Sequence, residues 1–130
     1  MVRLAPSEHY RFTQACPGSM DLTFGGAESS VAASISILGG SSRFVSALPQ
    51  HAIADAFVRQ MRGFKVDVDH VLRREAGRFG IYYVETGANQ RPSRVIYDRD
   101  YSAVSICPGE EYDWDAIFVD AQWLHISGIT

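Results

Sequence analysis

The stretch FGGAES, residues 24–29, joins two segments with different hydrophobic periods. Residues 21–24 before it have the composition of a β-strand, and residues 31–38 after it have the spacing of a helix. Two glycines at the start of a helix can cradle a phosphate, hold a sugar or simply turn the chain. A glycine pair alone is more often a turn than a binding site, so the surrounding sequence has to decide between these three interpretations.

The segment after the glycines is predicted to be a helix over residues 27–38. Apolar side chains recur in it every three or four positions and predict one buried face, formed by Ala27, Val31, Ile35 and Leu38. Gly39 and Gly40 follow at the position where a left-handed cap ends a helix. The turn Gly39-Gly-Ser-Ser42 has neither the lysine nor the spacing of a phosphate-binding P-loop, so we interpret it as a helix cap.

A second strand and helix are predicted next. Residues 43–48 have the composition of a strand, and residues 52–61 form an amphipathic helix that should bury Ala54, Phe57, Val58 and Met61. Strands that alternate with helices favour a parallel sheet covered by helices, which is an α/β fold.

The middle of the chain changes to a period of two residues. Residues 79–86 and 93–99 are rich in β-branched and aromatic side chains and are joined by a loop of hairpin length, so they predict an antiparallel pair. Residues 21–24 have a similar composition and are expected to join this pair in a small inserted sheet. Residues 2–5 predict a further short strand, residues 6–19 a loop, residues 112–118 a short helix and residues 122–128 an apolar strand.

Composition narrows the classes of function. The 130 residues are 46% hydrophobic with a formal net charge of −3, and the basic residues are scattered, which argues against a nucleic-acid-binding surface. No apolar run reaches the roughly 20 residues that cross a bilayer, and the first residues lack the layout of a secretion signal, so we expect a cytoplasmic protein. Cys16 and Cys107 lack the spacing of a zinc site, and the four histidines show no metal-binding pattern.

Five motifs, in a fixed order along the chain, resemble the N-terminal half of a ribokinase-like (PfkB) carbohydrate kinase, closest to the 2-keto-3-deoxygluconate kinase branch. They are residues 24–33, 39–40, 79–87, 95–100 and 123–130. The resemblance implies a partial Rossmann-like ribokinase fold with a small antiparallel β-sheet lid, whose strands lie near residues 20–25, 78–86 and 93–99. It also implies that residues 1–130 are the N-terminal portion of a sugar kinase that uses ATP and Mg²⁺, with the catalytic base and most of the ATP site in an absent C-terminal half. We therefore expect no catalytic residue and no metal ligand in this chain.

The same resemblance implies a set of sugar-binding residues, which are Gly25, Gly26, Ala27, Ser30, Tyr82, Tyr97, Arg99 and Ile129. Glycines allow a ligand to approach backbone N–H groups, and tyrosines offer both a flat face and a hydroxyl. The planar guanidinium of Arg99 can pair with a carboxylate, which predicts a sugar acid as the substrate. Ser30 departs from the asparagine usual in the family, and its shorter side chain predicts weaker sugar binding.

Two alternatives remain open from the sequence. The parent protein is expected to be a kinase of 2-keto-3-deoxygluconate or a similar acidic sugar, but a fructokinase-like PfkB enzyme fits the same motifs. A non-catalytic sugar-binding or dimerisation module is the second alternative, since lid strands have edges on which a second copy can pair.

Overall fold

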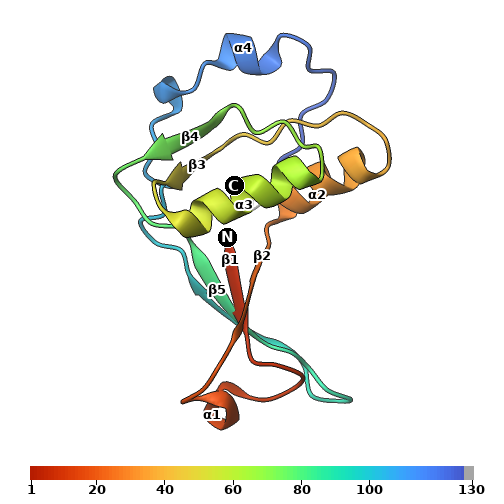
Figure 1. Ribbon diagram of the computed structural model, residues 1–130, viewed down its shortest axis with the longest axis vertical. Helices are drawn as coiled ribbons and strands as arrows, with labels where there is room; N and C mark the ends of the chain where they lie inside the picture. Colours follow the sequence, from red (N-terminus) through yellow and green to blue (C-terminus); the bar gives the residue numbers. More distant parts are fainter. Residues whose placement is uncertain (128–130) are drawn as a thin grey trace.

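The computed structural model describes residues 1–127 and consists of an α/β body from which a strongly twisted sheet extends (Figure 1). In chain order, the elements are β1 (Val2–Ala5), α1 (Phe12–Ala15), β2 (Asp21–Phe24), α2 (Ala27–Ile37), β3 (Ser46–Pro49), α3 (Ala52–Gly63), β4 (Val71–Arg74), β5 (Ile81–Glu85), β6 (Arg94–Asp98), a 3-10 turn (Gly109–Glu111) and α4 (Trp114–Phe118). The α/β class expected from the alternating periods is confirmed.

The extended sheet has four strands in the order β2-β1-β5-β6. β2 is antiparallel to β1 and β6 is antiparallel to β5, with Tyr82 opposite Tyr97 in the hairpin. The three strands expected near residues 20–25, 78–86 and 93–99 therefore share one sheet. The sheet is mixed rather than purely antiparallel, because β1 occupies its centre and runs parallel to β5.

The body contains the second sheet, in which β3 and β4 pair in parallel from Ser46 opposite Val71 to Pro49 opposite Arg74. Helix α3 buries Ala54, Phe57 and Met61, while Val58 is half-buried, so the predicted apolar face of this helix is confirmed. The Phe57 ring packs within 6 Å of three other aromatic rings, those of Phe24, Phe44 and Phe79. Because Phe24 ends β2, this cluster fixes the glycine pair against the core.

Helix α2 is present, but its predicted buried face is wrong. The buried residues are Ser29, Ala32 and Ser36, whereas Leu38 is 86% exposed and Ile35 is 42% exposed. The serines can be buried because their hydroxyls are satisfied: Ser29 donates to the Gly26 carbonyl at 3.1 Å, and the Ser36 and Ser42 hydroxyls lie 2.7 Å apart. Small, satisfied side chains let α2 pack closely on the core, and the larger aliphatic side chains lie outside.

The predicted end of α2 is confirmed. Gly39 has φ 92°, and its N–H donates to the Ser36 carbonyl at 3.1 Å while the Gly40 N–H donates to the Ile35 carbonyl at 2.9 Å. These two bonds form a Schellman cap, which requires a left-handed residue that glycine supplies without strain.

Three strand predictions need correction. The strand expected over residues 43–48 begins later, at Ser46, because Arg43 makes only an isolated bridge with Asp67. Strand β4 has no counterpart in the prediction. Of the strand expected over residues 122–128, the described part, residues 122–127, forms no strand and pairs with none of the strands of residues 1–121, and Trp123 is 92% exposed.

The remaining differences concern short elements and termini. The loop expected over residues 6–19 contains the single turn of α1, and the helix expected over residues 112–118 begins at Trp114, after Asp113 caps it by accepting from the Ala116 N–H at 3.1 Å. Cys16 and Cys107 are both free thiols. Within residues 1–127, no helix is long and apolar enough to span a membrane.

Candidate functional site

The candidate site lies on one face of the four-stranded sheet, where that sheet meets the start of α2. Residues directly opposite one another in neighbouring strands point to the same face. The register therefore places Tyr82 and Tyr97 on one face and Tyr83 on the other. A side chain at Gly25 would also point to the Tyr82 face, because a Cβ atom there would lie 2.1 Å from the Tyr82 hydroxyl oxygen. The Tyr82 hydroxyl thus occupies the space that a side chain at residue 25 would need.

Tyr82, Tyr97 and Arg99 form a continuous surface on this face. The two tyrosine rings are 6.2 Å apart between centroids and inclined by 32°. The Arg99 guanidinium carbon lies 5.0 Å from the centre of the Tyr97 ring, within the range of a cation–π contact. Tyr97 is 56% exposed, so the surface is open to a ligand.

The charge of Arg99 is not neutralised by the carboxylate next to it in sequence. Asp98 points to the other face and forms an ion pair with Arg78, whose hydrogen bond holds the pKa of the Asp98 carboxyl below its usual range. Within residues 1–127, no ion pair connects Arg99 to a carboxylate. Its guanidinium is therefore available to bind an anionic ligand.

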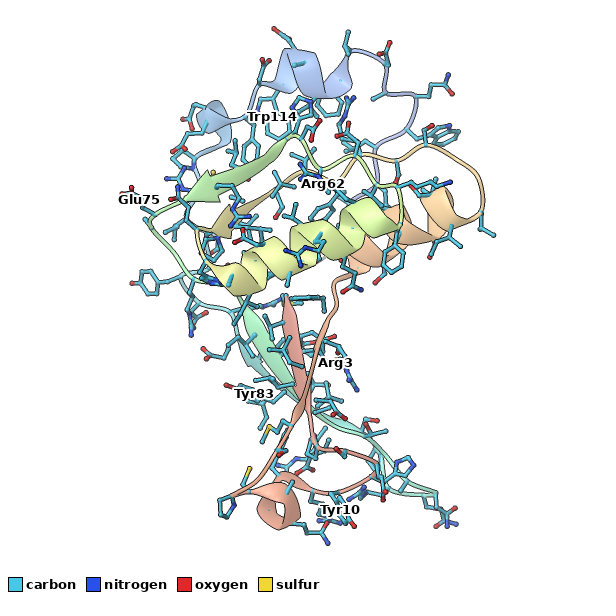
Figure 2. The ribbon with its side chains drawn as sticks, in the orientation of Figure 1. Arg3, Tyr10, Arg62, Glu75, Tyr83 and Trp114 are labelled. Atoms are coloured by element: carbon cyan, nitrogen blue, oxygen red, sulfur yellow. The ribbon has the colours of Figure 1, made fainter. Side chains whose placement is uncertain are left out.

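The opposite face of the sheet is covered at its far end by α1. The Phe12 ring meets the Tyr83 ring edge-on at 6.3 Å, and the Phe12 N–H donates to the buried Glu85 carboxylate at 2.9 Å. Figure 2 shows Arg3 and Tyr83 on opposite sides of the twisted sheet. Since α1 packs against the Tyr83 side, it leaves the Tyr82 side accessible.

The start of α2 borders the same surface. Gly26 is the residue before the first turn of the helix, Ala27 and Ser30 are exposed in that turn, and the Ser30 N–H is already bonded to the Gly26 carbonyl at 2.9 Å. A hollow of about 60 Å³ lies between the start of α2 and helix α3; Gly25 and Ser30 line it, but Tyr82, Tyr97 and Arg99 do not. Typical ligand pockets measure roughly 300 Å³ or more, so this hollow is too small to hold a sugar.

The structure thus brings together most of the residues that the sequence singled out. Gly25, Tyr82, Tyr97 and Arg99 share one face, and Gly26, Ala27 and Ser30 lie at the helix start beside it. Ile129 lies outside the described residues. Ser127, the last described residue, donates its N–H to the carboxylate of Glu28 in the first turn of α2 at 3.0 Å.

The sequence interpretation missed Arg3. In the register, Arg3 of β1 lies opposite Tyr82 on one side and Thr23 on the other, so it shares their face. Alternation along residues 2–5 gives the relative orientation of these side chains, but only the register shows which strand Arg3 borders.

A larger hollow of about 560 Å³ lies elsewhere, between α3 and β4. Its charged lining includes two ion pairs, Arg73 with Asp55 at 2.7 Å and Arg62 with Asp69 at 3.3 Å. It contains none of the predicted sugar-binding residues, and its exposed pairs are typical of a solvated surface. We therefore assign the candidate site to the sheet face and not to this larger hollow.

No cluster of three or more His, Cys, Asp or Glu in residues 1–127 is arranged to hold a metal ion. Gly25, before α2, adjoins the Tyr82 side chain, and Gly39 and Gly40 form the cap at the other end of the helix.

Comparison with known proteins defines the class. The sequence matches the family described as pfkB family carbohydrate kinase over residues 6–130, and the chain belongs to that family. It is 37% identical over its full length to the 2-dehydro-3-deoxygalactonokinase of Haloferax volcanii, of which it covers 40%. The chain therefore spans less than half the length of this relative.

Solved structures of sugar kinases also match this chain. The crystal structure of the Thermotoga maritima 2-dehydro-3-deoxygluconokinase matches all of this chain with a TM-score of 0.94 and 45% identity, and the match covers 39% of that protein. A Pyrococcus horikoshii sugar kinase solved in complex with ATP matches 90% of the chain with a TM-score of 0.78 and 19% identity, covering 37% of its own length. This second likeness shows the fold alone. The ribokinase-like fold predicted from the motifs is confirmed.

Proposed function

We propose that the protein carrying this chain is an ATP-dependent kinase of 2-keto-3-deoxygluconate or a close acidic sugar, and that residues 1–127 bind the acceptor sugar. The observation that carries this proposal is the shared face of Gly25, Tyr82, Tyr97 and Arg99 beside the start of α2. Family membership and two relatives named as kinases of 2-dehydro-3-deoxy sugars support it. Because the chain covers only about 40% of those relatives, activity is assigned to the parent protein.

In the proposed reaction, a hydroxyl oxygen of the sugar forms a bond to the γ-phosphorus of ATP. The bond from that phosphorus to the β-phosphate oxygen breaks, ADP leaves, and the hydroxyl proton passes to a base. The family resemblance places this base, and most of the nucleotide and Mg²⁺ contacts, outside residues 1–127. The described residues contribute binding and orientation, which hold the acceptor hydroxyl in place for the transfer.

Each residue of the face has a chemical task in this proposal. The rings of Tyr82 and Tyr97 pack against the carbon skeleton, and their hydroxyls exchange hydrogen bonds with the sugar oxygens. Arg99 pairs with the carboxylate, a group that a neutral ketose lacks. The four-stranded sheet would act as a lid that shields the sugar from water, because it extends from the body and carries these residues.

Substrate selectivity tests this assignment. We expect the purified full-length protein to phosphorylate 2-keto-3-deoxygluconate in a coupled ADP-release assay. Arg99→Ala should lower kcat/KM for the acid about 10- to 100-fold, because a charge-assisted pair is lost, while the low activity with fructose stays nearly constant. Arg94→Ala is the matched control, since Arg94 lies on the same strand but points to the other face. Equal losses with acidic and neutral sugars would refute the carboxylate role and favour a fructokinase-like enzyme.

A self-association role is the second candidate. Val95, Ile96 and Tyr97 lie on β6, which forms an edge of the sheet, and they are 45%, 53% and 56% exposed. Exposed apolar side chains on an edge strand favour pairing with a second copy of the sheet. Sedimentation of the full-length protein should show a dimer that Ile96→Lys converts to a monomer, and a monomeric wild type would exclude this role.

A further inference from the structure

Arg3 occupies the centre of the proposed sugar-binding face. It lies on β1, an inner strand, with Thr23 of β2 opposite it on one side and Tyr82 of β5 on the other. Tyr97 of β6 follows Tyr82 in the same row. Because directly paired residues point to the same side of a sheet, the four side chains form one row across all four strands.

The charge of Arg3 is half-buried and has no counter-ion among the described residues. No ion pair or side-chain hydrogen bond connects it to another residue within 1–127. The arginine side chain carries five N–H donors and no acceptor. An unpaired arginine in the middle of a ligand-facing row is therefore a candidate contact for an anion.

Arg3 and Arg99 lie on either side of the tyrosine pair. Neighbouring strands are about 4.8 Å apart and residues two positions apart on a strand are about 6.8 Å apart, which puts the two arginine Cα atoms about 12 Å from each other. Two extended arginine side chains can reach the same group across that separation. Without an anion between them, two like charges on one face repel each other, so a negatively charged ligand would relieve an unfavourable interaction.

We propose that Arg3 supplies a second guanidinium for the carboxylate end of the sugar acid, opposite Arg99. This inference rests on the proposed function of the same face and adds a residue that determines acid specificity. One guanidinium pairs with the carboxylate oxygens, and the other is close enough to hold the adjacent keto oxygen or the second carboxylate edge. Arg3 is thus a substrate-contacting residue rather than a structural one.

The test uses the full-length protein and isothermal titration calorimetry with 2-keto-3-deoxygluconate and with fructose as the neutral ketose. Arg3→Gln keeps a long polar side chain and removes the charge, and Arg3→Ala removes both. We expect each variant to weaken binding of the acid about 10- to 100-fold and to leave the fructose affinity within about threefold. Arg94→Gln, which removes a guanidinium from the opposite face, should change neither affinity.

The ratio of the two affinities separates a contact with the carboxylate from general damage to the fold. Equal weakening of acid and neutral sugar, or unchanged affinity for the acid in Arg3→Gln, would overturn the role of Arg3. If Arg99→Ala lowers acid binding while both Arg3 variants bind normally, this inference fails and the proposed function stands. If the wild-type protein binds no sugar acid, the proposed function itself fails.

Discussion

The substitution Gly25→Ala is predicted to weaken sugar binding strongly while leaving the protein folded. A Cβ atom at residue 25 would lie 2.1 Å from the Tyr82 hydroxyl oxygen, 3.1 Å from its Cζ atom and 3.4 Å from its Cε1 atom. An ordinary contact needs about 3.4 Å or more, so the hydroxyl must move by roughly 1.3 Å. The Tyr82 ring can achieve this only by leaving its position 6.2 Å from the Tyr97 ring.

The expected magnitude follows from that displacement. Moving a ring off its preferred rotamer costs about 0.5–1.5 kcal/mol, so the free energy of unfolding should fall by about 1 kcal/mol. A shift of about 1 Å in a substrate-positioning group can lower activity by about 100-fold. Gly25→Ala should therefore reduce affinity for 2-keto-3-deoxygluconate far more than it reduces stability.

The assay compares Gly25→Ala with a glycine that has open space around it. A Cβ atom at Gly63 meets nothing within 4 Å, so Gly63→Ala should retain full sugar affinity. In a Tyr82→Phe background the clashing oxygen is gone and the nearest ring atom is 3.1 Å away, so Gly25→Ala should then cost much less stability. Full-length protein, calorimetry with the sugar acid and thermal unfolding provide the readouts. Unchanged sugar affinity in Gly25→Ala would refute the placement of Tyr82 over Gly25.

Further predictions concern the packing and charges that position the site. Ser42→Ala removes a hydroxyl that donates to the Ala32 carbonyl at 2.8 Å and lies 2.7 Å from Ser36, so urea unfolding should show a loss of about 1–2 kcal/mol, against almost none for the exposed Ser41→Ala. Asp67 has a carboxyl pKa that partial burial raises and the Arg43 hydrogen bond lowers, with a net fall below 3.8. Because the Asp67 pKa is lower in the folded than in the unfolded protein, the ionised carboxyl stabilises the fold above pH 3.8, and this stabilisation is lost as the pH falls through the folded-state pKa. Asp67→Asn should therefore be less stable than the wild type at pH 7 and approach its stability near pH 3. An Asp67→Asn deficit that stayed constant between these pH values would contradict this explanation.

The elements with a strong local period were predictable from the sequence. Alternating aromatic and β-branched residues predicted the β5–β6 hairpin, whereas the pairing of Tyr82 with Tyr97 came from the structure. The three- and four-residue spacing in residues 52–61 gave helix α3 and its buried side chains. In α3 the side chains that pack inside are also the apolar ones, so the pattern and the burial agree in this helix.

Elements that depend on tertiary context were not predictable in the same way. Helix α2 buries serines because their hydroxyls find partners at Gly26 and Ser42, and a hydrophobic pattern contains no information about those partners. Strand β4 ends in two arginines, of which Arg73 pairs with Asp55 and Arg74 with Glu111, so its apolar signal is short. Residues 122–127 have the composition of a strand, but a strand also needs a neighbour to pair with.

The residues of the candidate site also divide into those that the sequence predicted and one that only the structure revealed. The glycine pair, the tyrosines and Arg99 came from motifs, and the structure placed four of these residues on one surface. Arg3 came only from the pairing of β1 with β5, because a parallel neighbour about 80 residues away leaves no local pattern.

A crystal structure of the full-length protein with bound 2-keto-3-deoxygluconate tests the central claim most directly. We predict the sugar on the Tyr82 face of the four-stranded sheet, with its carboxylate within about 3 Å of the Arg99 guanidinium and its skeleton against the Tyr82 and Tyr97 rings. A sugar bound on the Tyr83 face or in the hollow between α3 and β4, with Arg99 in solvent, would contradict it.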